Sequence, residues 1–183
     1  SVLRPGDTLW LRGGTYRGAF VSWLSGRTGA PITVRQFPGE RAVIDSAPSS
    51  KSALSIMGSW TVFRDFEVTN SDTQRRSSEP GPGPTDLRRG SGVSTGGKRN
   101  QLINLVVHDL ADGLGMFAES EGSSAYGNIV FNNGWAGPDR SHGHGIYTQN
   151  EIGPREIEEN ILFNQFSHGI HAFGSEVAHL DHI

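Results

Sequence analysis

Histidine is the residue type whose spacing in this 183-residue chain most directly suggests chemistry. Six of the seven histidines follow residue 140, and four of them form two close pairs, His142 with His144 and His168 with His171. An imidazole titrates near pH 6.5, so it can accept or donate a proton, and its neutral form binds transition metals. The pairs indicate acid–base catalysis or a metal site, or else side chains that only hydrogen-bond to backbone at turns.

A local pattern links two of these histidines to an aspartate. The pattern is a polar residue, a glycine and an apolar residue, and it occurs at residues 112–114, 144–146 and 168–170. If the segments are equivalent turns of a repeat, Asp112, His144 and His168 stack about 4.8 Å apart. A second register matches Gly143 in place of Gly145. It puts His142 in the stack and aligns three aromatic residues, Phe117, Tyr147 and Phe173.

Short strands are the elements expected to position these residues. Strand-like runs of β-branched and aromatic residues end in turn residues, and no segment keeps a helical period. Related segments recur at spacings of 24 and 32 residues, at 104–108, 128–132 and 160–164. Such units bury their apolar faces by stacking, which predicts an all-β parallel β-helix, a solenoid forming one domain over residues 1–183. Equivalent corners would carry an asparagine ladder of Asn104, Asn128 and Asn160.

Two long insertions interrupt this repeat, at about residues 71–90 and 133–143, and the equivalent corner between them, 109–112, is short. This arrangement predicts a trough across the helix axis, and loops on a rigid scaffold often carry binding sites. Arginines of the insertions suit the carboxylate or sulfate groups of an acidic polymer, unless they only solubilise a flexible loop. The candidate substrate-binding residues are Arg75, Arg76, Arg88, Arg89, Trp135, His108 and His171.

Composition excludes several classes of protein. The chain has no cysteine, so disulfides, thiolate nucleophiles and cysteine-ligated metals are ruled out. Its 16 basic and 19 acidic residues argue against a general nucleic-acid-binding protein, and its apolar runs are too short for membrane insertion. Glycine makes up 25 of 183 residues, about double the usual share of roughly 7%. Its recurrence among the short apolar runs indicates regular turns.

The opening of the sequence resembles a known family. Segments 3–16, 29–34, 37–40 and 42–45 are similar to the first coils of right-handed parallel β-helix proteins of the pectate-lyase-like superfamily, which includes secreted bacterial polysaccharide lyases. The same opening precedes lyases, epimerases, hydrolases and proteins of unknown role. The resemblance implies a right-handed β-helix and a secreted or cell-surface location. It also implies a fragment truncated at one or both ends, whose uncapped coils would associate end to end.

The resemblance also suggests a reaction, β-elimination from a uronic-acid-containing polysaccharide. A base removes the C5 proton, a cation neutralises the carboxylate and an acid protonates the leaving oxygen. Related lyases generally use lysine or arginine as the base together with calcium. The only lysines here are Lys51 and Lys98, and Lys98 lies at a different corner from the predicted trough. The candidate catalytic residues are therefore His144, His168, Asp112, His142, Arg140 and Tyr147.

Alternatives remain open at this stage. Asp109, Asp112 and Asp139 are weak candidates for calcium ligands, and no spaced metal-binding motif is present. The four paired histidines could instead hold a transition metal. The same aspartates could serve a glycoside hydrolase of this fold, which needs two carboxyl groups. A non-catalytic surface, fibre or carbohydrate-binding protein is the other alternative to a lyase.

Overall fold

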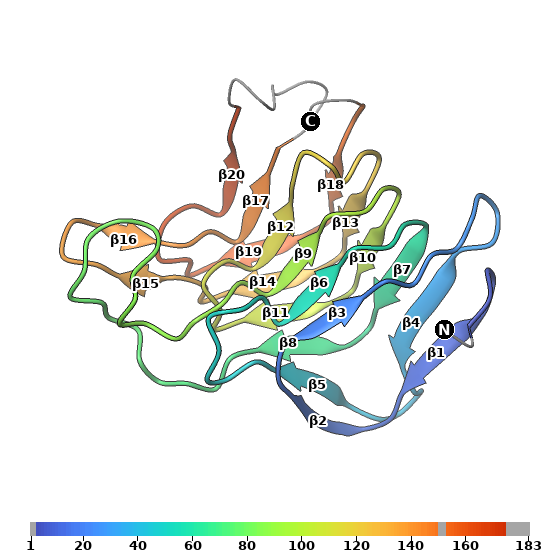
Figure 1. Cartoon of the computed structure of the whole chain (residues 1–183), viewed down its shortest axis with the longest axis horizontal. Coiled ribbons are helices and arrows are strands. Elements are labelled where there is room, and N and C mark those ends of the chain that lie inside the picture. The colour runs from blue at the N-terminus through green and yellow to red at the C-terminus, as the bar shows by residue number, and fades with distance from the viewer. Residues whose placement is uncertain (1–2, 150–152, 175–183) are drawn as a thin grey trace.

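The computed structural model describes residues 3–149 and 153–174, which form three parallel sheets stacked as a β-helix (Figure 1). The first sheet contains β1 (Thr8–Leu11), β4 (Ile32–Gln36), β7 (Thr61–Arg64), β10 (Gln101–Ile103), β13 (Ser124–Tyr126) and β18 (Glu156–Glu158). The second contains β2 (Gly14–Arg17), β5 (Ala42–Asp45), β8 (Glu67–Thr69), β11 (Val106–His108), β14 (Ile129–Phe131) and β19 (Ile161–Phe163). The third contains β3 (Phe20–Ser22), β6 (Leu54–Ile56), β9 (Val93–Thr95), β12 (Leu114–Met116), β17 (Ile146–Thr148) and β20 (Ile170–Ala172). The predicted all-β solenoid is confirmed.

The core is the interior of the stacked coils. Each short strand turns alternate side chains inward, and parallel pairing places equivalent side chains above one another. One such ladder joins Val93, Leu114 and Ile146, all with no exposed surface. Burying a side chain of this size stabilises the fold by roughly 1.5–3 kcal/mol. The coils therefore stabilise one another through these ladders.

The described residues include no helix that is long and apolar enough to cross a membrane.

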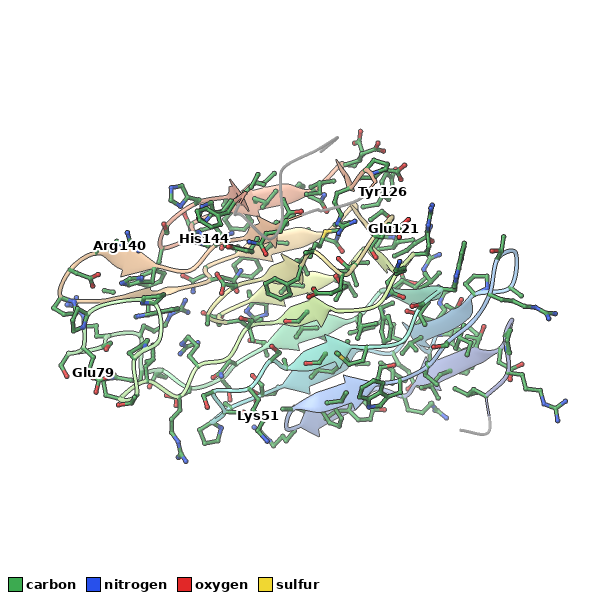
Figure 2. The ribbon with its side chains drawn as sticks, turned by 45° about the horizontal axis from the view of Figure 1, so that its top comes forward. Lys51, Glu79, Glu121, Tyr126, Arg140 and His144 are labelled. Carbon is green, nitrogen blue, oxygen red and sulfur yellow. The ribbon has the colours of Figure 1, made fainter. Side chains whose placement is uncertain are left out.

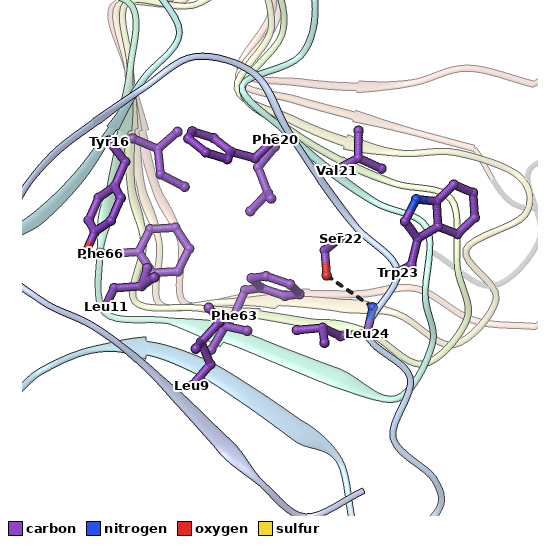
Figure 3. A pocket seen from close by; sticks show the side chains of 13 residues that line it. Leu9, Leu11, Tyr16, Phe20, Val21, Ser22, Trp23, Leu24, Phe63 and Phe66 are labelled. Atoms are coloured by element: carbon purple, nitrogen blue, oxygen red, sulfur yellow. Dashed lines mark hydrogen bonds between the residues drawn. The ribbon is translucent and has the colours of Figure 1, made fainter. Parts of the chain in front are cut away.

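The apolar interior is accessible at the first coil. A cavity of about 350 Å³ opens there, lined by Leu9, Phe20 and Phe63 among others (Figure 3). Trp23 beside it is 72% exposed. End-to-end association through such a face stays a prediction.

The corner between the first and second sheets corrects the predicted asparagine ladder. Leu105, not Asn104, is the residue equivalent to Asn128 and Asn160. The Asn128 side-chain oxygen accepts the Leu105 N–H at 2.9 Å, and the Asn160 oxygen accepts the Asn128 N–H at 2.9 Å. Asn104 instead occupies the preceding turn position at φ 50°, a left-handed conformation that asparagine tolerates. The ladder therefore has two asparagines, and the first repeat is offset by one residue.

The two insertions leave the coils where the sequence places them, between the second and third sheets. Residues 71–90 connect β8 to β9, and residues 133–143 connect β14 to β17 and contain a hairpin of β15 (Trp135–Ala136) and β16 (Ser141–His142). Figure 1 shows both loops extending from the same side of the solenoid. They touch each other, because Ala136 donates its N–H to the Arg75 carbonyl at 2.9 Å and Ser77 donates to the Ala136 carbonyl at 2.9 Å. The predicted trough is therefore reduced to a pocket, described below, that residues of both insertions and of the short corner line.

Candidate functional site

Arg89 ties the first insertion to the short corner at Asp109. Its side chain points under the first insertion and donates hydrogen bonds to the carbonyls of Asp72, Gln74 and Asp109. Only 5% of the residue is exposed. Burial, with a smaller effect from the nearby charge of Arg75, lowers the pKa of Arg89 to about 10. This guanidinium is enclosed by backbone and has a structural role, and the substrate-binding role predicted for it stays a prediction.

Arg75 has a similar structural task. It pairs with the Asp109 carboxylate and donates to the carbonyls of Asn132 and Gly134, the latter at 3.0 Å. Burial lowers the pKa of Arg75 more than Asp109 raises it. Arg75 therefore ties the first insertion to the second and is also not free to bind a polymer. Arg76 and Arg88 are exposed on the first insertion, and neither lines the pocket described below.

His108 lies in a separate network on the second sheet. Its ring stacks on Phe131 at 4.7 Å, and its two nitrogens contact Asp109 at 2.7 Å and Glu67 at 3.1 Å. Burial alone would lower the His108 pKa, but the two carboxylates outweigh it and raise the pKa above its ordinary value. The residue is consequently a partner of structural carboxylates, away from the pocket residues.

The first of the two predicted registers is confirmed on the third sheet. Leu114, Ile146 and Ile170 are paired, so Asp112, His144 and His168 precede them at equivalent positions on successive coils. Glycine is required at the intervening positions because the backbones of successive coils approach each other closely there. A Cβ on Gly113 would lie 2.4 Å from the Gly145 carbonyl oxygen, and one on Gly145 would lie 2.6 Å from that of Gly169. The alternative register is wrong, because Tyr147 aligns with Gly115 and His171.

Three histidines converge at this position. The His144 Nε2 atom lies 2.9 Å from His171 Nδ1, and the His144 Nδ1 atom lies 3.3 Å from His168 Nδ1. His171 reaches His144 from β20, three residues after His168. We call His144, His168 and His171 the histidine trio. His144 and His171 are half-buried, His168 is exposed, and the Ser167 hydroxyl contacts His168 Nδ1 at 2.8 Å.

Electrostatics keep the centre of the trio neutral. Burial first, and then the neighbouring His171 and His168, lower the pKa of His144 to about 4. The Asp112 carboxylate accepts a hydrogen bond from the backbone N–H of His144 at 2.9 Å. It does not contact the His144 imidazole, so it does not raise the pKa of that ring. Burial raises the pKa of Asp112 as well. Asp112 therefore positions the backbone of His144, while the His144 imidazole is uncharged at neutral pH.

A pocket of about 430 Å³ opens above the trio. Tyr147 lines it beside the histidines, with its ring centroid 5.2 Å from that of His171. Burial, and to a lesser degree Asp112, raises the pKa of Tyr147, so the phenol stays protonated. Arg140, exposed on the second insertion, lines the same pocket and lies on the same side of the molecule as His144 (Figure 2).

His142 and Trp135 form the base of the hairpin, where both are largely buried at the edge of the pocket. His142 is 5% exposed, stacks on Trp135 at 5.2 Å and contacts Asp139 at 3.1 Å through Nε2. The hydrogen bond from His142 lowers the pKa of Asp139 to about 2. Trp135 is also 5% exposed, with one face covered by His142. Both residues line the pocket, so the catalytic role predicted for His142 and the substrate-binding role predicted for Trp135 stay predictions.

The donor set does not fit calcium. Asp109, Asp112 and Asp139 each have the separate partners described above, and they do not gather around one point. In residues 3–149 and 153–174, the one group of three or more potential metal ligands is the histidine trio, with ligand atoms within 4.8 Å of one another. Calcium prefers oxygen ligands and imidazole does not supply them. The aspartate-based calcium site is therefore not supported.

Sequence reasoning missed two features of this site. Ser167, which contacts His168, was overlooked, although it directly precedes that histidine. The sequence predicts His171 as a substrate-binding residue or, with the other paired histidines, a transition-metal ligand, but not its direct contact with His144. Its position three residues after His168, across a corner into the next strand, was the signal that could have placed it there.

The fold resembles that of two polysaccharide lyases of known structure. Pectate lyase Pel9A superposes with a TM-score of 0.64 over 87% of this chain at 21% sequence identity. A rhamnogalacturonan lyase superposes with a TM-score of 0.55 over 94% of the chain at 12% identity. This chain spans 40% of the first protein and 56% of the second. The likeness confirms the fold as a right-handed parallel β-helix of the kind found in pectate lyases.

Sequence comparison adds no closer relationship. No protein-family model matches the chain, and no curated protein matches its sequence.

Proposed function

We propose that this chain carries the active site of an extracellular lyase that cleaves an acidic, uronic-acid-containing polysaccharide by β-elimination. The observation that carries the proposal is the pocket above the histidine trio, where imidazoles, the Tyr147 phenol and the Arg140 guanidinium line one cavity. These are the three kinds of group that the reaction needs: a proton acceptor, a proton donor and a cation. The likeness of the fold to polysaccharide lyases supports the same conclusion.

Each group has a distinct task. Arg140 pairs with the uronate carboxylate and stabilises the negative charge that develops on it when the C5 proton leaves. His168, the exposed member of the trio, accepts that proton. The electron pair of the C5–H bond forms the C4–C5 double bond, and the C4–O bond breaks. Tyr147 donates a proton to the leaving oxygen, and transfer of the proton from His168 to the tyrosinate restores both groups.

His144 and Asp112 act as positioning residues in this scheme. The Asp112 carboxylate holds the His144 backbone at 2.9 Å, and His144 contacts both other members of the trio. Because His144 stays neutral, it presents a lone pair to one histidine and an N–H to the other.

A hydrolase is less well supported. Asp109 is paired with Arg75 and His108, Asp139 is paired with His142, and Asp112 is turned to backbone. Hydrolysis of a glycosidic bond needs two carboxyl groups across the bond. The arrangement of these aspartates does not provide them.

The test is an activity screen with pectate, alginate and glycosaminoglycans, following the near-ultraviolet absorption of unsaturated sugar ends. We expect absorption to rise with at least one substrate. Arg140→Gln should reduce the rate about 10- to 100-fold, because a hydrogen bond to a charged group is worth about 1.5–3 kcal/mol. Arg27→Gln, which changes an exposed arginine in the loop before β4, is the matched control and should leave the rate unchanged.

Three outcomes would contradict the proposal. Cleavage that yields only saturated ends would identify a hydrolase. Binding without cleavage would identify a carbohydrate-binding protein. Equal losses of activity in the Arg140→Gln and Arg27→Gln variants would show that Arg140 has no specific role in the reaction.

A further inference from the structure

We infer that the histidine trio is a binding site for a divalent transition-metal ion, with Zn²⁺ as the representative ion. His144, His168 and His171 each offer one ring nitrogen, and these ligand atoms lie within 4.8 Å of one another. The inference goes beyond the proposed function and does not depend on it, because binding is measured with the metal ion alone.

The spacing of the nitrogens agrees with tetrahedral coordination. Zinc–nitrogen bonds of about 2.0–2.1 Å place two nitrogens of a tetrahedral site about 3.3 Å apart. The His168–His144 and His171–His144 nitrogen contacts are 3.3 and 2.9 Å. These two contacts involve different nitrogens of His144. With one nitrogen taken from each ring, the three ligand atoms all lie within 4.8 Å of one another, so only small side-chain movements separate them from a tetrahedral arrangement.

The scaffold holds the backbone of the trio in place. The Gly145 N–H donates to the His168 carbonyl at 3.0 Å, which joins the two coils directly below the side chains. The His144 N–H is held by Asp112 at 2.9 Å, and His171 sits in the parallel pairing of β17 with β20. His171 lies on β20, and His144 and His168 lie two residues before β17 and β20, so paired strands fix the backbone beside all three ligands.

The chemistry of the donors selects the class of metal. Three neutral imidazoles are ligands for Zn²⁺, Co²⁺, Ni²⁺ or Cu²⁺, whereas Ca²⁺ and Mg²⁺ require oxygen. The pocket above the trio leaves room for a fourth ligand, as in zinc sites with three histidines and an exchangeable position.

The two uses of the trio compete with each other. A lone pair bound to a metal cannot accept the C5 proton, so the metal-bound chain is expected to have lower lyase activity than the metal-free chain. Failure of metal binding would leave the lyase proposal intact, and absence of lyase activity would leave the metal site intact.

The test is titration of the metal-free full chain with Co²⁺, whose visible absorption reports coordination by nitrogen, followed by displacement with Zn²⁺. We expect one equivalent to bind with the intense absorption of a tetrahedral ion. His168→Gln and His171→Gln should each weaken binding by at least 10-fold. Far-ultraviolet circular dichroism checks that the variants keep the β-helix.

The control variants are His108→Gln, which changes a histidine outside the trio, and the double variant His179→Gln/His182→Gln, whose sites lie outside the described residues. Both should bind Co²⁺ like the unchanged chain. The site is wrongly assigned if either control weakens binding as much as the trio variants, if the trio variants bind normally, or if the unchanged chain shows only the weak absorption of hexahydrated Co²⁺.

Discussion

Replacement of Arg89 by alanine provides a direct test of how the first insertion is held. The Arg89 guanidinium donates to three backbone carbonyls and is 5% exposed. Each hydrogen bond from a charged donor contributes about 1.5–3 kcal/mol, which gives an upper limit of about 4–9 kcal/mol. In the variant, the insertion can open and let water bind the carbonyls, which reduces the loss of stability. Removal of the charge repulsion between Arg75 and Arg89 reduces the loss further. We therefore expect Arg89→Ala to lower the free energy of unfolding by about 2–4 kcal/mol.

The matched control is the neighbouring Arg88, which is exposed. Arg88→Ala should change the free energy of unfolding by less than about 0.5 kcal/mol. Urea unfolding measures both values, and hydrogen exchange should show faster exchange over residues 71–90 in Arg89→Ala alone. Equal stability of the two variants would refute the structural role of Arg89 and restore it as a candidate for substrate binding.

Two further predictions concern the hairpin and the core. The Asp139 pKa is about 2 because His142 donates to it, so its contribution to hairpin stability is complete above the ordinary aspartate pKa and is lost as the pH falls towards 2. Protection from hydrogen exchange over residues 135–142 should fall in that pH range in the unchanged chain but not in Asp139→Asn. The same pH dependence of protection in both proteins would contradict this prediction. Leu114→Ala should lower the free energy of unfolding, measured with urea, by about 2–5 kcal/mol, because Leu114 is fully buried. The control Ile161→Ala changes a residue that is 59% exposed and should lower the free energy of unfolding by less than about 1 kcal/mol. Comparable losses would show that Leu114 is not a core residue.

The sequence predicts the coils well because their signals are local. Gly113 and Gly145 are required by a close approach between coils, so the glycine pattern gives the correct register for Asp112, His144 and His168. The asparagine ladder fails at Asn104 because asparagine suits both the left-handed turn position and the inward-facing position next to it.

The trough is smaller than predicted for a different reason. Arginine in a glycine- and proline-rich loop has the same sequence signature whether it faces solvent or binds distant carbonyls. The contacts of Arg75 and Arg89 are made to residues up to 59 positions away, mostly through backbone atoms that carry no sequence signal. The contact between the two insertions therefore could not be predicted from the sequence, and neither could the extent of the pocket that remains open beside His144.

The most direct test of the proposed active site is a nuclear magnetic resonance titration of the histidine side chains with an oligosaccharide of uronic acid. Imidazole signals report ligand contact at His168 and His171, which line the pocket, and His108 serves as an internal control because it lies in a separate network. We predict that the signals of the histidine trio shift in a saturable manner while that of His108 does not move. Saturable shifts at His108 with an unchanged trio would contradict the assignment of the pocket as the polysaccharide site.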